Sequence, residues 1–105
     1  MSAIQIDIPE KQLMDFCQKW KISEFALFGS VLRQDFGPHS DIDVLITHMP
    51  GAKWNLYDLV HMIRELEAIF GRKVDLINRV GIEKSPNILL RQKILESIQV
   101  IHHAA

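Results

Sequence analysis

The stretch LFGSVLRQDFGPHSDIDVLI, Leu27–Ile46, decides the fold class because it places an apolar, strand-like segment at each end of a turn-rich spacer. The first segment is Phe25–Phe28 and the second is Asp41–Thr47. Residues i and i+2 of a strand share a face of the sheet. We therefore expect Asp41, Asp43 and Leu45 on one face and Ile42, Val44 and Ile46 on the other. Aspartate is a poor strand former. The two acidic side chains therefore indicate a function rather than a packing role.

Hydrophobic periodicity and turn signals outside this stretch predict the other elements. In chain order we expect a helix at Glu10–Lys21, a strand at Phe25–Phe28, a short helix at Ser30–Asp35, a strand at Asp41–Thr47, a helix at Asn55–Phe70, a strand at Lys73–Asn78, a helix opened by Ser85-Pro86 and ending near Glu96, and a short edge strand within Ser97–His102. This order predicts an α/β (α+β) fold, with a small mixed sheet of three to four strands flanked by helices. We expect residues 1–105 to form a single domain.

The helix at Asn55–Phe70 carries the clearest amphipathic pattern of the chain. Gly71 follows it as the expected C-cap. The residues assigned to its apolar stripe are Leu56, Leu59, Val60, Ile63, Leu66 and Phe70.

Composition excludes several classes of function. The 105 residues are 48% hydrophobic and 24% charged, and 12 basic residues nearly balance 13 acidic ones. No overall field therefore draws the chain to nucleic acid or to a membrane, and no direct nucleic-acid binding is expected. No apolar run approaches the roughly 18 residues of a membrane span. The single cysteine, Cys17, allows no internal disulfide and lies on an apolar helix face, so we expect a buried thiol and a cytoplasmic protein.

The acidic pair predicts a metal site once a third aspartate is considered. Two carboxylates a few ångströms apart repel each other, and a divalent cation such as Mg²⁺ or Mn²⁺ relieves that repulsion. An isolated Asp-x-Asp pair is more often a solvent-exposed feature of a strand. Asp75, however, interrupts a second apolar strand in the setting Val74-Asp75-Leu76-Ile77. Three converging carboxylates favour a metal site.

The Gly29-Ser30 pair predicts an anion site next to these carboxylates. Glycine lets the backbone approach a phosphate, and a serine at the start of a helix offers its hydroxyl beside unpaired N–H groups. Alone, such a pair is usually only a helix cap. Here the segment leads directly to the strand with Asp41 and Asp43, so bound phosphates would lie beside the metal.

The motif Gly29-Ser30, ten residues, then Asp41-Ile42-Asp43 resembles the GSx10DxD signature of minimal nucleotidyltransferase (MNT) proteins. These proteins belong to the polymerase-β-like nucleotidyltransferase superfamily. Asp75 is similar to the third carboxylate that the superfamily carries on a neighbouring strand. The resemblance extends over roughly residues 25–96 and implies a polymerase-β palm-like fold.

The resemblance also implies a reaction, in which a nucleoside monophosphate passes from an NTP, here ATP, to an acceptor hydroxyl and pyrophosphate is released. It implies that Asp41 and Asp43 bridge two Mg²⁺ ions, with Mn²⁺ as an alternative. It also implies that Asp75 completes the coordination of the second ion and accepts the proton of the acceptor hydroxyl. The nucleotide-binding residues that the resemblance implies are Gly29, Ser30, Arg33 and Ser40. For Arg33, a role next to pyrophosphate and a solvated position on a helix are equally good interpretations.

The small size of the expected domain leaves no second domain to wrap an acceptor. MNT proteins of this kind resemble the antitoxins of two-component systems whose toxin is a helical HEPN-domain RNase. The resemblance therefore implies an antitoxin that adenylylates a tyrosine of its HEPN toxin. Two alternatives stay open, namely a non-catalytic antitoxin that neutralises its partner by binding, and a nucleotidyltransferase with a small-molecule acceptor.

Overall fold

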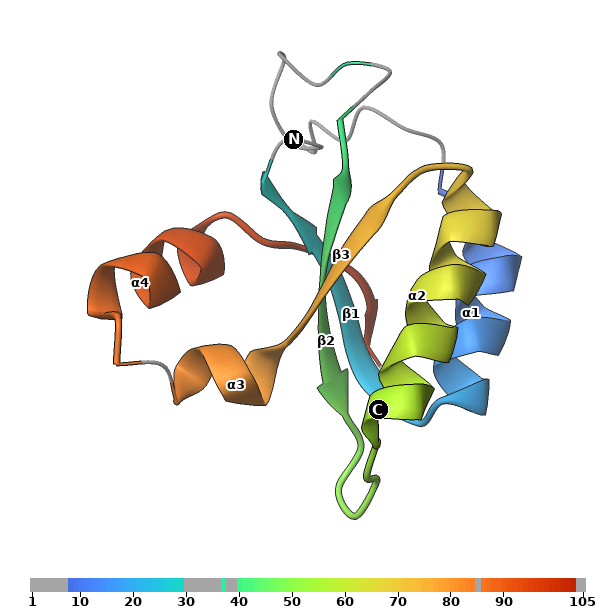
Figure 1. The fold of residues 1–105 in the computed structure, drawn as a ribbon, viewed down its shortest axis with the longest axis horizontal. Coiled ribbons are helices and arrows are strands. Elements are labelled where there is room, and N and C mark those ends of the chain that lie inside the picture. Colours follow the sequence, from blue (N-terminus) through green and yellow to red (C-terminus); the bar gives the residue numbers. More distant parts are fainter. Residues whose placement is uncertain (1–7, 30–36, 38–39, 85, 104–105) are drawn as a thin grey trace.

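A mixed four-stranded sheet in the order β3-β2-β1-β4 forms the centre of the protein (Figure 1). The computed structural model describes residues 8–29, 37, 40–84 and 86–103. The elements within these residues are α1 (Glu10–Lys19), β1 (Ile22–Phe28), β2 (Ile42–His48), α2 (Leu56–Phe70), β3 (Val74–Asn78), α3 (Arg79–Glu83), α4 (Ile88–Glu96) and β4 (Gln99–His103). The expected mixed sheet flanked by helices is confirmed, including the edge strand near the end of the chain.

The pairing of the strands follows from how they are connected. β1 pairs antiparallel with both β2 and β4. β2 and β3 are parallel, and α2 makes the crossover between them, as parallel neighbours require. The first residues of β2 and β3 and the last residues of β1 therefore meet at one end of the sheet, the upper end in Figure 1.

Helices cover both faces of the sheet. α1 and α2 pack on one face, where Ile42, Val44 and Ile46 of β2 are fully buried. Residues of α3 and α4 pack on the other face, against a smaller cluster centred on Phe28 and Leu45. Figure 1 shows the two helix pairs on opposite sides. The alternation predicted for the second strand is thus confirmed, and each buried Leu, Ile or Phe stabilises the fold by about 1.5–3 kcal/mol.

Several predicted boundaries are wrong. β1 begins at Ile22 and is longer than the predicted Phe25–Phe28. The last helix begins at Ile88, where the Asn87 side chain accepts the N–H of Leu90, and not at Ser85-Pro86. α3 was not predicted, because five residues containing a glycine carry no readable helical period. The short helix predicted at Ser30–Asp35 lies outside the described residues.

The predicted stripe of α2 is only half right. Gly71 is the left-handed C-cap, as predicted, whereas Asn55, predicted as the first helical residue, is the N-cap and forms a capping box with Asp58. Met62, which the stripe omitted, is fully buried beside Leu66, whereas Leu56 is 75% exposed and Val60 is 40% exposed. Two adjacent rows of residues on this helix are apolar, so hydrophobic periodicity alone does not show which row is buried. Packing against the sheet buries the row that contains Met62. No described helix has both the length and the apolar character to cross a membrane.

Cys17 is buried in the core, as predicted, and burial raises the pKa of its thiol from 9.0 to about 12. We expect Ellman's reagent at pH 8 to modify the native protein at least about a thousandfold more slowly than the urea-unfolded chain, because reaction requires opening of the core. Since the thiol ionises near pH 9 only when unfolded, its contribution to stability should be lost progressively as the pH rises from about 9 to about 12. Rapid labelling of the folded protein would contradict this environment.

Candidate active site

The register between β2 and β3 brings two of the predicted carboxylates together. Asp43 is the second residue of β2, Asp75 is the second residue of β3, and the two are direct partners in the parallel ladder. Their neighbours in the same register, Leu45 and Ile77, both pack in the cluster on the α3–α4 side. Paired residues of adjacent strands, about 4.8 Å apart, point to the same face. Asp43 and Asp75 therefore face the same side at one end of the sheet.

Asp41 lies at the same end of the sheet, immediately before Ile42, the first residue of β2. The N–H of Ile42 donates to the carbonyl of Lys73 at 2.9 Å, which continues the pairing of the two strands beyond the ladder itself. Asp41 and Asp75 are exposed and Asp43 is half-buried. Within the described residues, no three His, Cys, Asp or Glu side chains already converge as a formed metal site. The aspartates share one end of the sheet, and their joint binding of a metal stays a prediction.

Gly29 lies directly against the Asp43 carboxylate. It follows the last residue of β1, and Phe28 is the ladder partner of Asp43. Its φ of +73° is in the left-handed region that glycine adopts readily. A Cβ built on Gly29 would overlap Oδ2 of Asp43 and lie 3.3 Å from its Cγ. Glycine is therefore required here for two reasons, the backbone conformation and the space beside the carboxylate.

Ser40, predicted to bind nucleotide, is engaged in the chain segment that leads to Asp41. Its Oγ accepts the N–H of Gly37 at 3.0 Å, and its own N–H donates to the Gly37 carbonyl at 3.1 Å. Arg72 donates from Nη1 to the carbonyls of both residues. The hydroxyl of Ser40 thus takes part in a hydrogen bond that holds the backbone of this segment. Nothing in the sequence indicated that Arg72 binds the carbonyls of Gly37 and Ser40.

Two further predicted residues, Ser30 and Arg33, lie outside the described residues. Their proposed contacts with phosphate stay predictions. Gly29 marks the point where that segment begins, directly beside Asp43.

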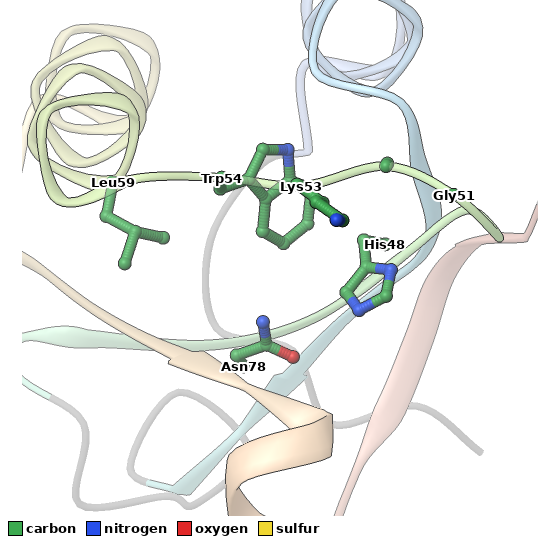
Figure 2. A pocket seen from close by; sticks show the side chains of 7 residues that line it. His48, Gly51, Lys53, Trp54, Leu59 and Asn78 are labelled. Carbon is green, nitrogen blue, oxygen red and sulfur yellow. The ribbon is translucent and has the colours of Figure 1, made fainter.

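A pocket of about 540 Å³ lies at the opposite end of the sheet from the aspartates (Figure 2). His48 and Asn78, the last residues of β2 and β3, line it together with Trp54. The Trp54 indole packs edge-on against His48 and donates to the carbonyl of Trp20 at 2.9 Å. Both tryptophans pack against the core. Of the predicted site residues that the structure describes, namely Gly29, Ser40, Asp41, Asp43 and Asp75, none lines this pocket.

Comparison with known proteins identifies the family. The model of the family described as "Nucleotidyltransferase domain" matches residues 9–101. Two Methanocaldococcus jannaschii proteins, both provisionally named protein adenylyltransferases, are similar in sequence. One is 36% identical over 64 residues, 61% of this chain and 64% of that protein, so the match spans less than two thirds of that relative. The other is 30% identical over 93 residues, 88% of this chain and 94% of that protein.

Solved structures share the fold. A protein provisionally called a minimal nucleotidyltransferase has a TM-score of 0.65 and 26% identity, over 86% of each chain. A toxin–antitoxin with AMP-PNP has a TM-score of 0.69 and 16% identity, over 92% of this chain and 75% of that one. A tri-AMPylated Shewanella oneidensis HEPN toxin in complex with MNT antitoxin has a TM-score of 0.60 and 16% identity, over 90% and 70%. The chain therefore belongs to the nucleotidyltransferase domain family, and its fold is that of the MNT antitoxins of HEPN/MNT toxin–antitoxin systems.

Proposed function

We propose that this protein is an antitoxin that transfers AMP from ATP to a tyrosine hydroxyl of a HEPN-type RNase toxin and releases pyrophosphate. The observation that carries the proposal is the pairing of Asp43 with Asp75, with Gly29 against the Asp43 carboxylate. The names of the similar proteins, which include protein adenylyltransferases and an MNT antitoxin with an AMPylated HEPN toxin, support this acceptor.

The residues at this end of the sheet fit a magnesium site by their donor chemistry. Asp41, Asp43 and Asp75 offer the hard carboxylate oxygens that Mg²⁺ and Mn²⁺ prefer, and all three lie at the same end of the sheet. Two ions bound there would neutralise charge on the triphosphate and make the attacking hydroxyl more acidic.

The backbone at Gly29 is the proposed start of the phosphate site. Because Gly29 has no Cβ, its backbone can lie directly against the Asp43 carboxylate, so phosphates bound at this turn would lie beside the proposed metal site. Backbone N–H groups that follow a glycine turn are suitable donors to such an anion. We assign the β- and γ-phosphates to Gly29 and Ser30, with Arg33 near the departing pyrophosphate and Ser40 beside it.

We assign to Asp75 the role of accepting the proton of the acceptor hydroxyl. β3 is an edge strand of the sheet formed by the described residues, and Asp75 is exposed on it. A folded partner can therefore bring a tyrosine to this carboxylate. The tyrosine oxygen forms a bond to the α-phosphorus while the bond from that phosphorus to the bridging oxygen breaks. Pyrophosphate leaves with that electron pair, and Asp75 takes the hydroxyl proton.

The test is AMP transfer to a co-purified partner. We expect the protein, ATP and Mg²⁺ to add one or more AMP units to the partner, detected by intact mass, and to label a tyrosine, located by fragmentation. Removing Mg²⁺ with EDTA should abolish the modification. The Asp41→Asn/Asp43→Asn variant is the matched control because it preserves side-chain shape.

Three results would contradict the proposal. If the double variant modifies the partner as fast as the parent does, the carboxylates are not the catalytic site. If no AMP is transferred and the variant still suppresses toxicity in cells, the protein neutralises its partner by binding alone. Pyrophosphate release that depends on a small molecule instead of the partner would reassign the acceptor.

A further inference from the structure

Arg72 connects the junction of α2 and β3 to the chain segment just before Asp41. This half-buried side chain donates from Nη1 to the carbonyl of Gly37 at 2.8 Å and to the carbonyl of Ser40 at 3.3 Å. Ser40 is the residue before Asp41. The arginine therefore acts on the backbone immediately next to a predicted metal ligand, although it lies outside the Gly-Ser and Asp-x-Asp motif.

The two carbonyls belong to a segment with its own internal bonds. The N–H of Gly37 donates to Oγ of Ser40, and the N–H of Ser40 donates to the Gly37 carbonyl. These bonds tie the two residues to each other but not to the sheet. Arg72 connects them to the sheet at a second strand, because it precedes the residues that enter β3.

The backbone on both sides of Arg72 is held in place. Gly71 is in the left-handed conformation, and its N–H donates to the Glu67 carbonyl at 2.8 Å. On the other side, the Lys73 carbonyl accepts from Ile42, and the Val74 N–H donates to the Glu67 carboxylate at 3.2 Å. The arginine thus projects from a fixed point between the last turn of α2 and the strand that carries Asp75.

We propose that Arg72 is a positioning residue for nucleotidyl transfer, which holds the backbone at Asp41 in the place where its carboxylate can share a metal with Asp43 and Asp75. The inference rests on the proposed function of this site. A guanidinium suits the role because the two N–H groups of Nη1, which reach both carbonyls, are fixed in the plane of its fork, whereas the donors of an ammonium rotate on a flexible stem. Misplacement of a ligand by about 1 Å is enough to slow such a reaction markedly.

The first test does not depend on activity. In the Arg72→Ala variant we expect the amides of Ser40 and Ile42 to exchange with deuterium about tenfold or more faster, measured by NMR, while amides in α1 keep their parent rates. Mn²⁺ alone, titrated by electron paramagnetic resonance, should bind on the order of tenfold more weakly, as expected when a group supporting a metal ligand is lost.

Arg64→Ala is the matched control, since Arg64 is an exposed arginine of α2 and its loss removes the same charge. We expect parent exchange rates and parent Mn²⁺ affinity for this variant. Unchanged exchange at Ser40 and Ile42 together with unchanged Mn²⁺ affinity in Arg72→Ala would overturn the proposal.

The second test separates positioning from a direct charge contact with ATP. Arg72→Ala should lower kcat for AMP transfer on the order of tenfold and change the KM for ATP by less than about threefold. Arg72→Lys keeps the charge but not the fork, so kcat should stay low in this variant as well. Full recovery of kcat in Arg72→Lys would overturn the positioning role. If the parent itself transfers no AMP, the proposed function fails, while the exchange and Mn²⁺ measurements still test Arg72.

Discussion

We expect the replacement of Asp43 by asparagine to lower the rate of AMP transfer by about a thousandfold or more, because the proposed mechanism assigns to its charge several kcal/mol of metal-dependent stabilisation of the transition state. Asp43 lies against Gly29 and is the direct strand partner of Asp75. Asparagine has nearly the same shape, so the strand and the core below it should be preserved. Single-turnover transfer to the partner, followed by intact mass, measures the effect.

The same substitution should also remove the stabilisation of the fold by metal. Addition of Mg²⁺ should raise the melting temperature of the parent but not of the variant. Asp15→Asn, which removes an exposed carboxylate from α1, is the control and should retain parent activity. An Asp43→Asn protein with more than about a tenth of parent activity would refute the assignment.

Replacing Gly29 by alanine is expected to reduce AMP transfer on the order of a hundredfold, because the new methyl group would push the Asp43 carboxylate out of position. The φ of +73° adds a backbone penalty of about 1–2 kcal/mol for any residue with a Cβ. The variant should therefore lose both activity and stability, measured by transfer rate and by urea unfolding.

Gly51→Ala separates these two effects. Gly51 also has a positive φ, +83°, but a Cβ there would meet no atom within 4 Å. The backbone penalty is thus comparable and the collision with a carboxylate is absent. We expect Gly51→Ala to be destabilised by a similar amount and to keep parent activity. If Gly29→Ala loses no more activity than Gly51→Ala, the contact between Gly29 and Asp43 has no catalytic consequence.

Much of the fold could be predicted because its signals are local. The alternation of β2 correctly separated Ile42, Val44 and Ile46 from the acidic face. Gly71 was correctly predicted as the C-cap of α2 from its place directly after the apolar stripe. The failures arose where local signals were absent or ambiguous. α3 is too short to show a period, and Asn87 made a better N-cap than the Ser85-Pro86 pair suggested.

The candidate site divides in the same way. The motif and Asp75 were found from the sequence because acidic residues inside apolar strands contradict the usual composition of strands. Arg72 had no such signal, since a single arginine after a helix is ordinary. Its contacts with Gly37 and Ser40 appear only when residues distant in the chain are brought together.

The sequence by itself determined which residues of each strand share a face, because alternation is a property of the extended backbone that needs no partner. It also indicated a metal and phosphate site, because glycine and aspartate are disfavoured in strands and therefore need a specific reason to occur at Gly29, Asp43 and Asp75. Only the tertiary structure decided that Asp43 pairs with Asp75 and that Gly29 contacts Asp43. The physical reason is that lateral register is set by hydrogen bonds between strands and by packing of their buried faces. Both connect residues far apart in sequence, so no local pattern can specify them.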